Sequence, residues 1–141
     1  MKKENRDNLF FDDTPFIFLD KTNFIKDKDV IFSDIFTSFR ITAYLPCYVA
    51  CQHKPGVGIK DQDERRLEEV EFFEPKTSFS RMREILLKRR ANWVVINSSP
   101  GYAIYGYPCG HPETITKLKY HSGLFELIYD KDDWAIFRMR Q

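Results

Sequence analysis

The chain of 141 residues carries 22 basic and 21 acidic side chains, which leaves a formal net charge of +1 at pH 7. That balance predicts no nucleic-acid partner, because nucleic-acid binding rests on a concentrated basic surface. Three cysteines are too few for a disulfide scaffold, and no apolar run reaches the roughly 20 residues that a membrane-spanning helix needs. The length fits one domain. We place it at residues 14–141, after a polar segment over residues 1–13 that we expect to be frayed.

The first half of the domain alternates helical and extended patterns. Pro15 indicates a helix start, because proline suits the first turn of a helix. The short run VIF (residues 30–32) is rich in β-formers, and Ser33 or Asp34 directly after it is typical of a helix cap. In chain order we therefore expect a helix from Thr14, a strand over residues 30–32, a helix over residues 35–44 and a second strand over residues 47–52.

Two charged helices come next. In the first, over residues 61–74, Leu67, Val70 and Phe73 recur at helical spacing and predict its apolar face. The second, over residues 77–90, ends in a basic cluster that we interpret as cations meeting the negative end of the helix dipole. The cluster consists of Lys88, Arg89 and Arg90.

The remaining chain predicts one more helix and three strands. Residues 93–96 (WVVI) are continuously apolar, as expected of a strand that helices cover on both faces. After an irregular segment, residues 111–123 form a helical pattern with Pro112 in its first turn. The last stretch, residues 125–140, predicts a hairpin with a four-residue turn at DKDD.

This order of elements predicts a small three-layer α/β domain. Strands that alternate with helices favour crossover connections, so we expect a Rossmann-like, mostly parallel sheet. The C-terminal antiparallel hairpin would add strands at the edge of that sheet. The sequence shows no internal repeat and no second domain.

Asp34 is the first candidate for chemistry, since it lies at the carboxyl end of the first strand, where open α/β sheets bind ligands. One interpretation makes it a nucleophile, but the second Asp of a dehalogenase-like phosphatase is replaced by Phe36. The other makes it a helix cap worth about 1 kcal/mol, and we favour that one. A ligand at this edge would also meet Ser38, His53 and Asn97.

The irregular loop from residue 100 to residue 110 is the second candidate. It combines tyrosines with glycines and prolines, and irregular loops of this length often have a binding role. We expect either a contact with a ligand or partner, or tyrosines that pack back on the domain. The tyrosines are Tyr102, Tyr105 and Tyr107.

The cysteines and histidines are the third candidate. Alternate residues of a strand share one face, so Cys47, Cys51 and His53 should point the same way. Together with Cys109 and His111, Cys51 and His53 could form a Cys₂His₂ zinc site. A Cys51–Cys109 disulfide and buried, idle thiols are the alternatives, and we favour idle thiols and no cofactor.

Three segments in order resemble a known family. They are KDKDVIFSDIFTSFRITAYLPCYVACQH, RRLEEVEFFEPKTSFSRMREILLKRRANWVVINSS and HSGLFELIYDKDDWAIFRMR. Their order and spacing look like the C-terminal extracytoplasmic domain of polytopic bacterial membrane glycosyltransferases, relatives of the protein mannosyltransferases and lipid A aminoarabinose transferases. The likeness covers residues 14–141 and is weakest in the tyrosine-rich loop. The family often has proline where this chain has Ile35 and Thr42.

The resemblance implies that the chemistry lies elsewhere. In that family the catalytic carboxylates sit between membrane helices and act on a polyprenyl-phosphate-linked sugar, so we assign no catalytic residue to this chain. The chain would then be a soluble accessory domain that was excised, truncated or encoded separately. Its partner would be the membrane-embedded part of the enzyme, and it would lie on the extracytoplasmic face of the membrane. The alternative is a free-standing small α/β enzyme or nucleotide-sugar-binding protein with its site near Asp34. That alternative would be cytoplasmic, because the N-terminus has no signal-peptide pattern.

Overall fold

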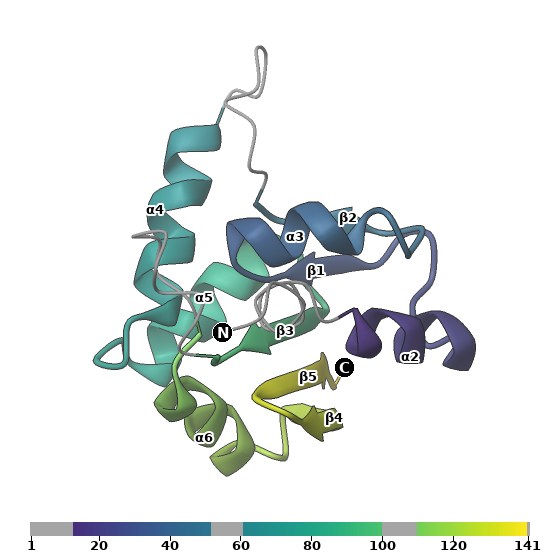
Figure 1. The fold of residues 1–141 in the computed structure, drawn as a ribbon. Coiled ribbons are helices and arrows are strands. Elements are labelled where there is room, and N and C mark those ends of the chain that lie inside the picture. Colours follow the sequence, from purple (N-terminus) through teal and green to yellow (C-terminus); the bar gives the residue numbers. More distant parts are fainter. Residues whose placement is uncertain (1–12, 52–60, 100–109, 141) are drawn as a thin grey trace, which may run out of the picture.

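The computed structural model describes residues 13–51, 61–99 and 110–140. Within these ranges the chain forms five helices and one five-stranded sheet, and the order of elements confirms the predicted one (Figure 1). The elements are α2 (Thr14–Thr22), β1 (Val30–Phe32), α3 (Ile35–Ile41), β2 (Tyr48–Val49), α4 (Gln62–Phe73), α5 (Phe79–Lys88), β3 (Trp93–Asn97), α6 (Pro112–Tyr120), β4 (Phe125–Lys131) and β5 (Trp134–Met139).

The sheet is mixed, with strand order β2-β1-β3-β5-β4. Strand β1 runs parallel to β2 and β3, whereas β5 runs antiparallel to both β3 and β4. The prediction of an α/β domain is confirmed, but the predicted mostly parallel, Rossmann-like layout is wrong. The parallel strands β1 and β2 have only 3 and 2 residues. The hairpin strands have 7 and 6, and β5 pairs along the whole of β3, so most of the pairing is antiparallel.

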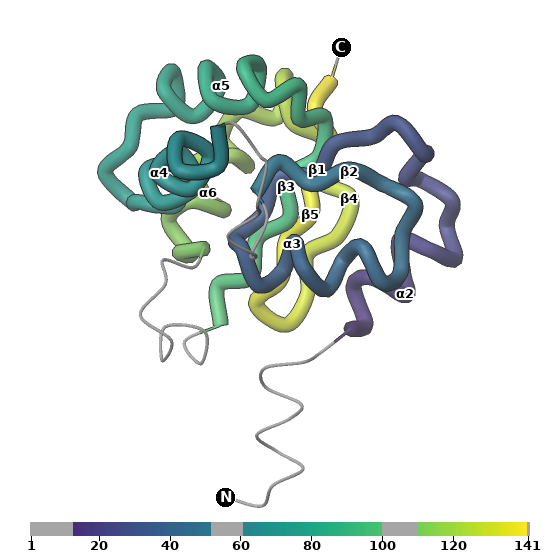
Figure 2. The backbone as a smooth tube through the Cα atoms, turned by 90° about the horizontal axis from the view of Figure 1, so that it is seen from above, coloured from purple at the N-terminus to yellow at the C-terminus, as the bar shows by residue number. Residues whose placement is uncertain are grey.

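Two hydrophobic cores lie on opposite faces of this sheet. Along β3, Val94 and Ile96 point into one core, and Trp93 and Val95 point into the other. Helices α4, α5 and α6 cover the first face, and α2 and α3 cover the second, which gives three layers (Figure 2). Each large apolar side chain that is fully buried contributes about 1.5–3 kcal/mol. Burial on both faces of the sheet is therefore the main driving force for this fold.

Local signals position the helix starts. Pro15 lies in the first turn of α2, as predicted. Asp34 caps α3, because its Oδ1 accepts a hydrogen bond from the backbone N–H of Thr37 at 2.9 Å. Ser78 caps α5 in the same way and accepts from the backbone N–H of Arg81 at 3.2 Å. Each such cap satisfies an N–H group that the first turn of a helix leaves without a backbone acceptor.

Strand β2 and the hairpin turn are both shorter than predicted. Because β2 ends at Val49, the strand alternation does not extend to Cys51. Cys47 packs against the α2–α3 core and Cys51 lies in the other core, so the prediction that they share a face is wrong. The turn between β4 and β5 contains only Asp132 and Asp133, which adopt positive φ angles of 53° and 68°. Positive φ at both positions is the geometry of a two-residue hairpin turn.

The buried face of α4 contains Phe73, as predicted, but otherwise differs from the predicted face. Leu67 is 70% exposed, whereas Glu68 and Glu69 are buried beside Phe72 and Phe73. The helix is rotated in this way because its end packs aromatic rings on the sheet: Phe72 lies against Phe32 of β1 with ring centroids 4.5 Å apart.

The basic cluster at the end of α5 has a further role that the dipole interpretation missed. Arg89 is buried and forms ion pairs with Glu68 of α4 and with Asp61, the residue directly before that helix. Lys88 pairs with Glu64 on the same helix. These contacts join α4 to α5 at the surface of the first core.

Phe72→Ala should lower the free energy of unfolding by about 3–5 kcal/mol, because it removes a ring that is fully buried against β1. The matched control on the same helix is Leu67→Ala, which should change it by no more than about 0.5 kcal/mol. Urea denaturation of both variants measures the difference. Equal losses would contradict the observed orientation of α4.

Candidate functional site

The polar edge of the sheet is where β1, β2 and β3 reach their carboxyl ends. Asp34 follows β1, Cys51 follows β2, and Asn97 is the last residue of β3. Parallel neighbours end at the same edge, so these three residues lie at one side of the molecule. All three are buried.

Asp34 is held by two hydrogen bonds from a single residue. Its Oδ1 accepts from the backbone N–H of Thr37, and its Oδ2 accepts from the Thr37 hydroxyl at 2.7 Å. Burial raises the pKa of this carboxyl above its ordinary 3.8, and the hydrogen bonds from Thr37 oppose that shift. The side chain is 1% exposed. This geometry confirms the predicted capping role, and it turns both carboxylate oxygens toward the first turn of α3.

Ser38 and Asn97, which we predicted as ligand contacts, make hydrogen bonds inside the domain. The Ser38 and Ser33 hydroxyls are 2.6 Å apart and hydrogen-bonded. The Asn97 Oδ1 accepts from the backbone N–H of Ser99 at 2.9 Å. These bonds stabilise the strand ends. A role for either residue in binding a ligand stays a prediction.

Glu69 of α4 is the site residue that the sequence analysis missed. It is 1% exposed, no described side chain donates a hydrogen bond to its carboxylate oxygens, and the backbone amide of Ile35 is the donor that acts on them. Burial, together with the negative charge of Asp34, raises the pKa of the Glu69 carboxyl from 4.5 to about 8. The backbone amide of Ile35 and the guanidinium of Arg66 act in the opposite direction. A buried carboxyl is thus protonated over much of the neutral range.

The spacing of Glu69 contains the signal that could have found it. It precedes Phe72 by three residues and Phe73 by four, and residues at those spacings share a helix face. Both rings are fully buried, so Glu69 is carried into the core with them. Its neighbour Glu68 is buried too, but Arg89 neutralises that carboxylate.

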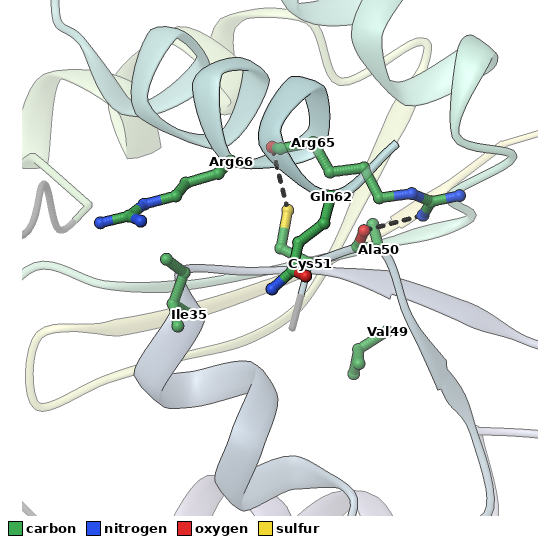
Figure 3. Close-up of a pocket in the computed structure, with 7 residues that line it drawn as sticks. All are labelled: Ile35, Val49, Ala50, Cys51, Gln62, Arg65 and Arg66. Carbon is green, nitrogen blue, oxygen red and sulfur yellow. Dashed lines mark hydrogen bonds between the residues drawn. The ribbon is translucent and has the colours of Figure 1, made fainter. Parts of the chain in front are cut away.

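A pocket of about 190 Å³ opens between α3, the end of β2 and the first turns of α4 (Figure 3). Arg65 closes one wall, since its Nη1 donates to the carbonyl oxygen of Ala50 at 2.8 Å. The Cys51 thiol donates to the carbonyl oxygen of Arg65 at 3.5 Å. The lining residues are Ile35, Val49, Ala50, Cys51, Gln62, Arg65 and Arg66.

The thiols of Cys51, at this edge, and of Cys47, before the start of β2, are protonated at neutral pH. Burial, with the negative charge of Glu69 next, raises the pKa of Cys51 to about 12. Burial likewise raises the pKa of Cys47 to about 11, and both residues are free cysteines. A free Cys51 does not fit the disulfide alternative. A thiolate is the nucleophile in cysteine chemistry, so these residues fit the predicted idle thiols.

Several predicted site residues lie outside the described ranges: His53, Tyr102, Tyr105, Tyr107 and Cys109. Of the predicted zinc ligands, Cys51 is buried and His111, directly before α6, is exposed. The described residues contain no group of three or more His, Cys, Asp or Glu side chains placed to hold a metal ion. The zinc site stays a prediction.

Comparison with solved structures identifies a shared fold. The chain matches the C-terminal globular domain of an oligosaccharyltransferase from Archaeoglobus fulgidus with a TM-score of 0.55. The sequence identity is 15%, and the match covers 89% of this chain and 94% of that one. The two chains have the same fold. The predicted resemblance to the C-terminal domain of a glycosyltransferase is thus confirmed at the level of the fold.

Comparisons of the sequence with known families and proteins do not assign the chain to a family. No protein-family model matches the chain, and no curated protein matches it significantly. None of the helices in the described ranges combines the length and apolar character that crossing a membrane requires.

Asp34→Ala should lower the free energy of unfolding by about 1–3 kcal/mol, because it removes the cap of α3 and leaves two buried Thr37 donors without an acceptor. Asp34→Asn keeps one carbonyl acceptor and should cost less. Chemical denaturation of both variants provides the comparison. An Asp34→Ala protein as stable as the wild type would show that the cap contributes nothing.

Glu69→Gln should stabilise the protein at alkaline pH. The unfolded chain loses this proton near pH 4.5 and the folded chain near pH 8, so the folded state holds one more proton between these values. Stability therefore falls as pH rises through that window. Above this pH window, the free energy of unfolding of Glu69→Gln should exceed that of the wild type by about 1–3 kcal/mol.

The matched control is Glu68→Gln on the same helix. It removes the partner of buried Arg89 and should destabilise the protein, because an unpaired buried charge is costly. Urea denaturation of the three proteins between about pH 5 and pH 9 measures both effects. Parallel pH profiles for Glu69→Gln and wild type would contradict the assigned pKa.

Proposed function

We propose that this chain is a soluble accessory domain of a membrane glycosyltransferase that uses lipid-linked sugar donors, of the kind found in bacterial protein mannosyltransferases and aminoarabinose transferases. The single observation that carries the proposal is the fold match to the globular domain of an oligosaccharyltransferase over almost the full length of both chains. Its partner is the membrane-embedded part of the same enzyme or a partner membrane protein. Its place is the extracytoplasmic face of the membrane.

The chemistry of the polar edge supports a role without catalysis. Both oxygens of Asp34 accept hydrogen bonds from Thr37, so the carboxylate is turned toward a helix terminus and away from solvent. Burial keeps the Cys51 thiol in its protonated, unreactive form. A nucleophile must reach its substrate as well as its base, and the hydroxyl that bonds to Asp34, that of Thr37, is fully buried.

The proposal predicts that sugar transfer depends on the domain, although the domain alone is inactive. Membranes from source cells with and without the coding segment for residues 14–141 would be assayed for transfer of labelled sugar from polyprenyl-phosphate donors. We expect transfer to fall severalfold without the domain, and the purified chain to transfer or hydrolyse none of these donors. An immunoblot for the membrane-embedded partner controls for its loss.

Turnover by the purified chain would overturn the proposal if Asp34→Asn abolished it. So would unchanged transfer in membranes that lack the domain but retain the partner. The first result would show that this chain is itself an enzyme. The second would show that sugar transfer by the membrane enzyme does not depend on this chain.

A nucleotide-sugar-binding protein is the second candidate, favoured by the pocket between α3 and α4. Gln62 and Arg66 supply hydrogen-bond donors at its wall (Figure 3). A ligand that binds only the folded chain raises its melting temperature. A panel of nucleotide sugars should then produce a rise that Gln62→Ala and Arg66→Ala reduce. No rise across the panel would remove this candidate.

A further inference from the structure

A second groove lies at the opposite end of β3 from the polar edge, where β3 begins and β5 ends. Trp93, the first residue of β3, pairs with Arg138 of β5 at this point, and both residues line the groove. The groove volume of about 520 Å³ falls within the roughly 300–1,000 Å³ that is typical of small-molecule sites. Its charged lining residues are Asp29, Glu126, Arg138 and Arg140. The two carboxylates balance the two guanidiniums, so the lining carries no net charge.

Aromatic rings hold the guanidinium of Arg138 in place. Its Cζ lies 5.4 Å from the ring centroid of Phe24 and 5.6 Å from that of Trp93, and a ring face attracts a cation at such distances. The Trp93 ring is fixed in turn, because its Nε1–H donates to Oδ2 of Asp29 at 3.0 Å. The Asn92 side-chain amide donates to Oδ1 of the same carboxylate at 2.7 Å. Arg138 is therefore positioned before a ligand arrives, which reduces the entropy lost on binding.

Glu126 and Arg138 keep hydrogen-bonding atoms open to the groove. The Nε and Nη2 groups of Arg138 donate to Oε2 of Glu126 at 3.1 Å and 2.7 Å. Within the described part of the chain, the Nη1 group of Arg138 and Oε1 of Glu126 make no hydrogen bond. The two side chains are 38% and 34% exposed, so a ligand reaches them from solvent.

Arg140 adds further open donors. Its Nε group donates to the carbonyl oxygen of Ser122 at 3.0 Å, which fixes the side chain. Its Nη1 lies 4.0 Å from Oε2 of Glu126, beyond hydrogen-bond distance. The Nη groups of Arg140 thus donate to none of the described residues, and the side chain is 49% exposed.

We propose that this groove binds a saccharide, with Arg138, Glu126 and Arg140 as its hydrogen-bonding residues. The open atoms include donors and an acceptor, and each hydroxyl of a sugar likewise donates one hydrogen bond and accepts others. A neutral ligand also suits a lining whose charges cancel. The half-buried side chains of Phe24 and Met139 add apolar surface for the C–H groups of a sugar ring.

A phosphate fits this groove less well. Arginine donors bind phosphate oxygens, but Oε1 of Glu126 would then lie beside a second anion, and like charges repel. The inference goes beyond the proposed function, because an accessory domain need not bind sugar itself. The saccharide would belong either to a free glycan or to a lipid-linked donor, which share this chemistry.

A ¹H–¹⁵N NMR titration of the purified full chain tests the proposal. The chain has two tryptophans: the Trp93 indole lies at the groove, and Trp134 lies at the opposite end of β5. The protein would be titrated with glucose, mannose, galactose, N-acetylglucosamine and their linear oligosaccharides. We expect a saturable shift of the Trp93 indole N–H signal with at least one of these sugars, and no shift of the Trp134 signal.

Arg140→Gln should weaken the binding of that sugar at least about tenfold, because hydrogen bonds to charged groups are the stronger ones. Glu126→Gln should weaken it as well, since it removes the charged acceptor. The control is Arg83→Gln, which removes a positive charge from an exposed position on α5 and should bind as the wild type does. An unchanged Trp93 indole signal in the free variants shows that the groove is intact.

No saturable shift with any of these sugars would overturn the proposal, and so would equal affinity in Arg140→Gln. A response to sodium phosphate without a response to sugars would overturn it too, because the site would then bind anions. Comparison of the free sugar with the same sugar on a short-chain polyprenyl phosphate identifies the source, and either preference supports a saccharide site. Binding is measured on the purified chain, so its failure leaves the dependence of sugar transfer on the domain untouched.

Discussion

The central constraint is that the sheet is buried on both faces. All five residues of β3, from Trp93 to Asn97, are buried, and their side chains alternate between the two cores. A strand enclosed in this way has no lateral surface left for ligands. Polar groups of β3 can meet solvent only where this strand ends, and the polar edge next to β1 is one of those places. The position of the candidate site thus follows from the packing of the core.

The parts of the fold that the sequence predicted are those set by local chemistry. The caps at Asp34 and Ser78 and the proline in the first turn of α2 act over a few residues, so their positions can be inferred without knowledge of the fold. The order of elements followed from these signals. The placement of β5 beside β3 and the rotation of α4 depend on contacts between distant segments, such as Phe72 on Phe32, and no local pattern encodes them.

The candidate site also combines a residue that local sequence signals reveal with one that they do not. Asp34 could be predicted because it directly follows the end of a β-rich run and is a residue typical of helix caps. The predicted capping role is confirmed. Glu69 was overlooked because a carboxylate on a charged helix is usually solvated, and only its spacing to Phe72 and Phe73 indicates burial. Both oxygens of Asp34 accept hydrogen bonds from Thr37, whereas the Glu69 carboxyl receives none from a described side chain and meets the backbone amide of Ile35.

A ¹³C NMR titration of the Glu69 side-chain carboxyl is the most direct test of the burial of this group behind Phe72 and Phe73, because it reports ionisation of one group without any substitution. The chemical shift should change with a midpoint near pH 8 in a buffer without divalent ions. A midpoint near the ordinary 4.5 would show that Glu69 is solvated or paired, and would contradict the description of the polar edge given above.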